Sequence, residues 1–277
     1  DSTAVHESNV ILLAFNECDG YMCLPELISA FIQPNSPTVE LILANAAATL
    51  KKWGQSSAIS GYQSKDPGVA CNIAGAIFAA ISSCQINYCV PPASFESGGQ
   101  KIRFPEVILD NKLGTCLDLT LFFCACLEQA GLNSLVILTR NHAFAGLWLK
   151  DESFPLCFVD NSLALRKRVE LKEIMVFETT TVTHDNSDFS IATRIGEQKL
   201  LDDDYVGCID IKRCRSTHIL PLPIFFDGLK VGIKVQHSGE IARSDNAKPV
   251  ELLQPVFVES KRSEERRVGK ECRSRWS

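Results

Sequence analysis

The sequence predicts an α+β fold in which helices come first and strands follow. Apolar residues recur at helical spacing over residues 38–53 and 69–83. Another apolar helix is expected over 116–130, because Gly131 supplies the residue type that most often ends a helix in a left-handed conformation. Helices followed by strands favour an α+β arrangement over an alternating parallel sheet. The expected strands are three β-branched or apolar stretches at 135–139, 142–149 and 174–177.

The helical part begins near residue 24, where Pro25 suits a first helical turn. Proline, asparagine and serine interrupt the pattern at 33–37, and a polar loop is expected at 60–67. The helix over 69–83 is small and apolar on most of its faces, so it should be buried. Residues 88–97 are expected to be extended.

These changes in pattern divide the chain into five segments. We expect a connector or the end of a preceding domain at 1–22, a helical subdomain at 23–95, a core domain at 96–223, a linker at 224–261 and an unnatural tail at 262–277. The tail resembles a translated sequencing adapter, so it is excluded from the fold reasoning. Because the chain begins at Asp1 without a methionine, we also expect it to be a piece of a larger protein.

Charge and hydropathy exclude two classes of partner. Removing the tail's six basic and three acidic residues from the 28 and 33 of the whole sequence leaves 22 and 30, a formal net charge of −8. Such an acidic segment should repel phosphate backbones, so direct nucleic-acid binding is not expected. The least charged stretch, 70–90, is interrupted by polar residues and reads as a buried helix, so no membrane span is expected.

Eleven cysteines remain outside the tail, scattered and without a CxxC pair. An odd, scattered set favours free thiols in a reducing cytoplasm over a disulfide framework. The pairs Cys18/Cys23 and Cys208/Cys214 lack further ligands at zinc-site spacing. We therefore expect neither a metal nor another cofactor.

One cysteine stands at a position that favours reactivity. Thr115 can cap the helix that starts at Cys116, and Asp118 can reach back to complete a capping box. Helix N-termini carry partial positive charge, which lowers the pKa of a thiol and favours the nucleophilic thiolate. The backbone amide of Cys116 would also face a substrate oxyanion. Gln100 could offer another oxyanion donor, but we interpret it as a turn residue.

His142 opens the second expected strand and is the candidate base. Alternation would place it on one face with Phe144, Gly146 and Trp148. The helix that carries Cys116 must pack on the sheet, so the imidazole meets the sulfur if His142 projects towards the helix N-terminus. We interpret Trp148 as a core residue rather than a substrate platform.

Three motifs together resemble the transglutaminase-like superfamily. They are GTCLDL at 114–119, LEQAGL at 127–132 and NHAFAGLW at 141–148. The resemblance implies a papain-like fold, in which a cysteine-bearing helix packs on an antiparallel sheet and a Cys-His-Asp triad acts. More narrowly, residues 24–223 resemble the version embedded in very large bacterial proteins that also carry helicase and nuclease-like domains.

The resemblance leaves two candidates for the third member of the triad. Glu178 ends the strand 174–177 and is followed by Thr179, which is similar to the family's strand-end motif with Glu in place of Asp. Asp160 follows the apolar residues 156–159 at a more ordinary distance from His142. We favour Glu178 and read 160–169 as a family-specific insertion, and any carboxylate could orient the imidazole.

Two hypotheses of function follow. In the first, Cys116 and His142 carry out acyl transfer, most simply hydrolysis of a peptide or protein amide, with Glu178 or Asp160 holding the imidazole. In the second, the domain is catalytically inactive and binds a partner within a defence-type helicase or nuclease protein. A sulfur and imidazole far beyond hydrogen-bond reach would favour the second hypothesis. Partners implied by the resemblance are a protein or peptide substrate and the other domains of the parent chain.

Overall fold

The computed structural model of the chain describes residues 14–18, 24–90, 100–202 and 204–223. The helices are η1 (Pro25–Phe31, a 3-10 helix), α1 (Pro37–Lys52), α2 (Pro67–Ser82), α3 (Pro105–Asn111), α4 (Cys116–Gln129), α5 (Ser162–Glu170), η2 (Thr179–Thr183, a 3-10 helix), α6 (Phe189–Lys199) and α7 (Ile211–Ser216). The strands are β1 (Glu17–Cys18), β2 (Asn87–Tyr88), β3 (Gln100–Lys101), β4 (Leu113–Gly114), β5 (Ser134–Thr139), β6 (Ala143–Trp148), β7 (Phe158–Val159), β8 (Ile174–Phe177) and β9 (Tyr205–Asp210). The expected linker and tail at 224–277 lie outside the described residues, as does most of the expected connector at 1–22.

A five-stranded sheet with the order β7-β9-β5-β6-β8 lies at the centre of the fold, and all its neighbouring strands are antiparallel. β5 and β6 form a hairpin in which Leu138 pairs with Ala143. Two short strand pairs lie outside this sheet, β1 with β3 antiparallel and β2 with β4 parallel. Helices and antiparallel strands in one chain make the fold α+β, as the sequence predicts.

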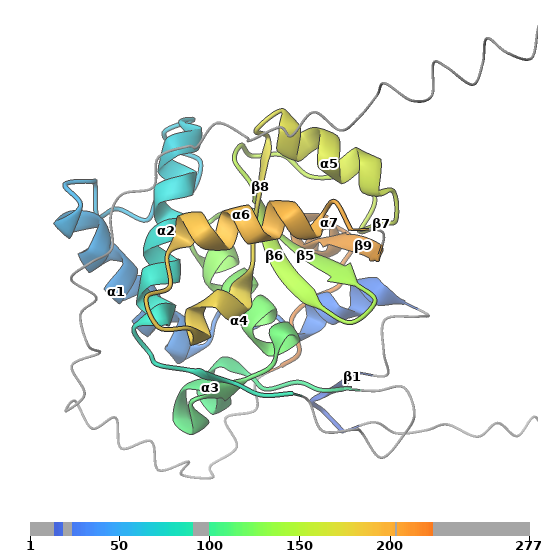
Figure 1. Cartoon of the computed structure of the whole chain (residues 1–277), viewed down its shortest axis with the longest axis horizontal. Helices are drawn as coiled ribbons and strands as arrows, with labels where there is room; N and C mark the ends of the chain where they lie inside the picture. Colours follow the sequence, from blue (N-terminus) through green and yellow to red (C-terminus); the bar gives the residue numbers. More distant parts are fainter. Residues whose placement is uncertain (1–13, 19–23, 91–99, 203, 224–277) are drawn as a thin grey trace, which may run out of the picture.

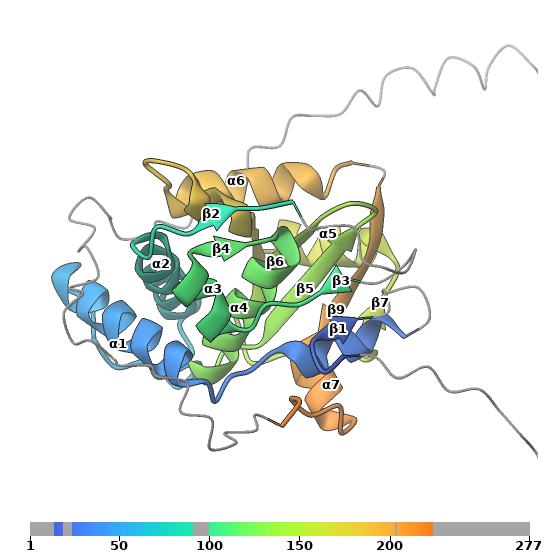
Figure 2. The same ribbon diagram turned by 90° about the horizontal axis from the view of Figure 1, so that it is seen from below.

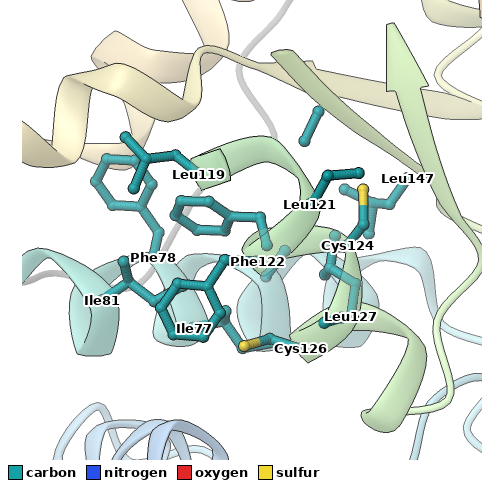
Figure 3. Packing of buried hydrophobic residues seen from close by; sticks show 14 of the residues in the cluster. Ile77, Phe78, Ile81, Leu119, Leu121, Phe122, Cys124, Cys126, Leu127 and Leu147 are labelled. Carbon is teal, nitrogen blue, oxygen red and sulfur yellow. The ribbon is translucent and has the colours of Figure 1, made fainter. Parts of the chain in front are cut away.

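Helix α4 is the central helix of the molecule. It packs on β5 and β6 with one side and on α1 and α2 with the other (Figure 1). Figure 3 shows both contacts, with Ile77 and Phe78 of α2 near Phe122 and with Leu147 of β6 near Leu121. The apolar cluster is continuous through these layers, so residues from either side of the boundary expected at 95/96 are packed into one core.

The opposite face of the sheet carries a second, smaller cluster. Phe144 and Trp148 of β6 pack there against Leu165 of α5. The Trp148 indole donates to Asp210 Oδ2 at 3.0 Å, which satisfies its N–H inside the core. Trp148 is 1% exposed, so it is a core residue, as expected.

The N-terminal helices begin at a polar cap followed by proline. Ser36 Oγ accepts a hydrogen bond from the Thr38 amide at 3.1 Å, and Asp66 Oδ1 accepts one from the Gly68 amide at 2.8 Å. A proline follows each cap. It has no backbone N–H, and in the first turn of a helix such an N–H would have no partner within the helix; its fixed φ also suits a helix. These caps start α1 and α2 within two residues of the starts expected from periodicity.

Several elements were not predicted. Helices α5 and α6 are short and largely polar outside, and β9 contains Gly207 and Cys208, so none gives a strong periodic signal. β9 nevertheless pairs with β5 near the middle of the sheet, because strand order follows long-range packing. The expected insertion at 160–169 is helix α5, and the first expected helix is the 3-10 helix η1.

Candidate active site

Cys116 is the first residue of α4, and a network of polar contacts fixes the turn that carries it. Thr115 Oγ1 accepts from the Asp118 amide at 3.1 Å, while Asp118 Oδ2 accepts from the Thr115 amide at 3.0 Å, so the expected capping box is present. Arg103 donates to buried Asp118 through its backbone amide at 2.8 Å and its guanidinium at 3.0 Å. Gln100, expected in a turn, lies in β3 and donates to Thr115 Oγ1 at 3.0 Å. The cap therefore holds the half-buried Cys116 thiol at the positively polarised end of α4.

His142 lies in the connection between β5 and β6, one residue before β6 begins. Its imidazole is hydrogen-bonded to the Cys116 sulfur, and the backbone amide of Ala143 donates to the same sulfur. The sulfur and the imidazole are thus within the reach that the acyl-transfer hypothesis requires.

The expected strand alternation describes His142, although His142 lies one residue before β6. Its ring is stacked beside that of Phe144, with ring centroids 6.5 Å apart and an interplanar angle of 24°. Phe144 and Trp148 point to the face of the sheet away from α4. From this position the His142 ring reaches Cys116 at the N-terminus of α4.

Glu178 accepts a hydrogen bond from the other nitrogen of the imidazole. His142 Nε2 and Glu178 Oε2 are 2.7 Å apart, which leaves Nδ1 for the sulfur. The Thr180 amide and hydroxyl donate to Glu178 Oε1 at 2.9 and 2.8 Å, and Lys199 Nζ lies 3.5 Å from Oε2. Glu178 is 2% exposed and is the N-cap of η2 directly after β8, so its carboxylate has one well-defined position.

Asp160, the other candidate acid, does not take part. It is exposed and follows β7, the edge strand on the far side of the sheet from β8. Strands β9 and β5 separate β7 from β6, so Asp160 cannot reach the imidazole. The ordinary sequence distance from His142 was misleading, because α5 and β7 lie between the His142 strand and the strand that carries the acid.

The three groups shift one another's pKa in mutually consistent directions. Burial raises the pKa of the Cys116 thiol, but the hydrogen bond and charge of His142 outweigh this effect, and the pKa lies below its ordinary value. Burial lowers the pKa of His142, yet its bonds to Cys116 and Glu178 raise it to about 9. Burial raises the pKa of Glu178, but His142 and Thr180 lower it by more. The pKa therefore lies below its ordinary value, and the carboxyl stays ionised.

These shifts favour a thiolate beside an imidazolium. The thiolate is the nucleophilic form of cysteine, and the imidazolium is placed to give its proton to a leaving group. A carboxylate on the far nitrogen fixes the orientation of the ring and stabilises its charge. The arrangement can therefore perform nucleophilic acyl transfer.

One residue at the sulfur was not among the expected site residues. The hydroxyl of Tyr88 in β2 is hydrogen-bonded to the Cys116 sulfur. Parallel pairing of β2 with β4 brings Tyr88 opposite Gly114, two residues before Cys116 (Figure 2). The sequence holds no signal for this contact, because pairing between two-residue strands depends on tertiary packing.

Comparisons with known proteins leave the family open, since no family model, curated protein or solved structure matches the chain. Within the described residues, no three His, Cys, Asp or Glu side chains are grouped so that they could hold a metal ion. The ten described cysteines are free thiols. The part of the chain that the structure describes contains no helix long and apolar enough to cross a bilayer.

Proposed function

We propose that the chain carries a cysteine-dependent acyl-transfer domain that hydrolyses peptide or amide bonds. The observation that carries the proposal is the contact series Cys116 sulfur, His142 imidazole and Glu178 carboxylate at the capped start of α4. The order of the three residues along the chain and the packing of α4 on an antiparallel sheet both agree with a papain-like, transglutaminase-like core. The motifs at 114–119 and 141–148 support the same proposal by resemblance.

In the proposed reaction, the Cys116 thiolate attacks the carbonyl carbon of an amide. The carbon–sulfur bond forms, the carbonyl electron pair moves to oxygen, and the oxyanion then expels the amine, which takes the proton from His142 Nδ1. A water molecule gives its proton to His142 and attacks the thioester, which releases the acid and restores the thiolate. Glu178 keeps its bond to Nε2 throughout.

The wider setting of the domain is part of the proposal. We propose a protein or peptide as substrate, because an amide carbonyl is the group that this nucleophile and acid suit. The other partners would be the helicase-like and nuclease-like domains of a large bacterial parent chain. A cytoplasmic location suits a reactive thiol that must stay reduced.

The test uses p-nitrophenyl acetate, an activated ester that reports acylation through release of p-nitrophenolate. The purified chain should be acetylated at Cys116, as shown by mass spectrometry of its peptides, and should release p-nitrophenolate faster than buffer alone. Cys116→Ala should abolish both signals. Cys89→Ala is the matched control, since Cys89 is a nearby, partly exposed thiol whose pKa is raised by burial, and it should change neither.

The inactive binding module is the contrary outcome. A wild-type chain that is folded but is neither acetylated at Cys116 nor faster than buffer would overturn the enzymatic proposal. A rate that persists in Cys116→Ala would also overturn it, because the nucleophile would then be a different group.

A further inference from the structure

We propose that Tyr88 is a further catalytic residue, whose hydroxyl donates a hydrogen bond to the oxyanion formed when the Cys116 sulfur attacks a carbonyl. The proposal rests on the acyl-transfer function above and adds a residue to that site. Three observations support it: the pairing that places Tyr88, the contact of its hydroxyl and its exposure.

The backbone of β2 and β4 fixes the position of Tyr88. The two strands are parallel, with Tyr88 paired to Gly114, and the Cys89 amide donates to the Gly114 carbonyl at 3.0 Å. The Asn87 amide donates to the Lys112 carbonyl at 2.8 Å, so the pair is held on both sides of Tyr88. Because Gly114 and Thr115 lead directly into Cys116, the strand that carries Tyr88 runs beside the approach to α4 (Figure 2).

The hydroxyl reaches the reacting atom itself. It is hydrogen-bonded to the Cys116 sulfur, as are the His142 imidazole and the Ala143 amide. A carbonyl carbon that bonds to the sulfur places its oxygen beside the sulfur, among the groups that surround it. The imidazole is needed for the leaving group, which leaves Tyr88 as the side-chain donor for the oxygen.

Helix α4 offers a second donor for the same oxygen. The first amides of a helix have no acceptor within the helix, and the capping box engages the amide of Asp118. The Cys116 amide belongs to this first turn and is covalently next to the sulfur. A side-chain hydroxyl and a backbone amide on one oxyanion form a two-donor arrangement, which is common in acyl-transfer sites.

Exposure and ionisation of Tyr88 fit this role. Tyr88 is 44% exposed, whereas Glu178 is 2% exposed, so Tyr88 lies on the side of the site that solvent and substrate can reach. Burial and the negative charges of Cys116 and Glu178 raise the pKa of Tyr88. The phenol therefore keeps its proton at neutral pH and can act as a donor.

The experiment compares two reactions of the same sulfur. With p-nitrophenyl acetate, the sulfur adds to the carbonyl, an oxyanion forms, and p-nitrophenolate then leaves with its electron pair. With iodoacetamide, the sulfur displaces iodide at a saturated carbon and no oxyanion forms. An oxyanion donor should therefore matter in the first reaction only.

Tyr88→Phe should slow acetylation of Cys116 by roughly 10²- to 10³-fold, the usual loss for one oxyanion donor. Its alkylation by iodoacetamide should stay within about twofold of wild type when both are measured at pH 9, where the thiolate is present without the hydroxyl's help. Tyr205→Phe is the matched control, because Tyr205 donates to the Val159 carbonyl at 2.8 Å on the far side of the sheet. It should leave both reactions unchanged.

Other outcomes would overturn the proposal. If Tyr88→Phe slows acetylation and alkylation equally, Tyr88 stabilises the thiolate or the fold and not the oxyanion. If neither rate changes, Tyr88 has no part in the reaction. If both reactions become faster, the Tyr88 side chain blocks access to the sulfur. A wild-type chain without acetylation at Cys116 would instead contradict the proposed function. Alkylation of the wild type at Cys116 near neutral pH would show separately whether the thiol is activated.

Discussion

Two regions of α4 carry cysteines, and they differ in almost every property that governs reactivity. Cys116 lies at the first turn, half-buried, with an imidazole, a hydroxyl and a backbone amide around its sulfur. Cys124 and Cys126 lie two to three turns later, fully buried between α2 and β6 (Figure 3). Burial raises the pKa of Cys124 to about 12 and that of Cys126 well above its ordinary range.

One helix therefore holds both an activated thiol and inert thiols. In the middle of α4 the amides are paired within the helix, and desolvation is the largest influence on the pKa of Cys124 and of Cys126. At its start, desolvation also acts on Cys116, but a positive neighbour and several donors outweigh it. Buried cysteines without such partners behave as small apolar residues.

Removing the imidazole should make Cys116 resemble the thiols further along α4. In His142→Ala the pKa of Cys116 should rise above its ordinary value, because burial would still raise it while the hydrogen bond and charge of His142, which lower it most, would be lost. Hydrolysis of p-nitrophenyl acetate should fall by ~10³-fold or more, since the proton relay is lost with the charge partner. His218→Ala, a change at an exposed histidine, should hydrolyse the ester at the wild-type rate. Wild-type activity in His142→Ala would show that the imidazole does not activate Cys116.

Changing Glu178, the acid that binds His142, should reduce turnover by less. Glu178→Gln should keep a hydrogen bond to His142 but lose the negative charge, so turnover should fall by ~10²-fold or more. Asp160→Asn is the matched control and should have no effect, because Asp160 lies beyond the far edge of the sheet. Steady-state hydrolysis of the same ester measures both variants. A loss in Asp160→Asn with none in Glu178→Gln would reverse the assignment.

The pH profile sharpens the comparison further. Activity should be lost as pH falls through the lowered pKa of Cys116, where the thiolate gains a proton. Hydrolysis of an amide substrate, whose leaving amine needs a proton, should also fall about tenfold per unit as pH rises above about 9, where His142 loses that proton. In Glu178→Gln the upper limit should move to lower pH, because the carboxylate raises the pKa of His142. An upper limit that does not move would contradict this coupling.

The smallest effect concerns the cap. Thr115→Ala removes the acceptor for the Asp118 amide and for the Gln100 side chain. The free energy of unfolding should fall by about 1 kcal/mol, the usual cost of losing an N-cap side chain. Urea denaturation measures it, and Thr115→Ser, which keeps the hydroxyl, is the control. A loss in Thr115→Ser as large as that in Thr115→Ala would show that the hydroxyl is not what stabilises the turn.

The sequence indicated those parts of the site that depend on local patterns. The capping box at Thr115 and Asp118, the strand 174–177 and its terminal Glu178 all follow from neighbouring residues. Alternation placed His142 beside Phe144, but its contact with Cys116 was not predictable, because it depends on how α4 packs on the sheet. Tyr88 and Lys199 reach the site through β2 pairing and the end of α6, which connect segments far apart in the chain. The position of β9 between β7 and β5 has the same cause.

The most direct test is the pH dependence of iodoacetamide alkylation at Cys116, followed in the native protein by mass spectrometry of each cysteine-containing peptide. We expect a midpoint for Cys116 below 8.5, the ordinary value for a thiol, with Cys124 and Cys126 unreactive over the same range. A midpoint at or above 8.5 for Cys116 would contradict it, since the thiol at the start of α4 would then be no more activated than an isolated cysteine.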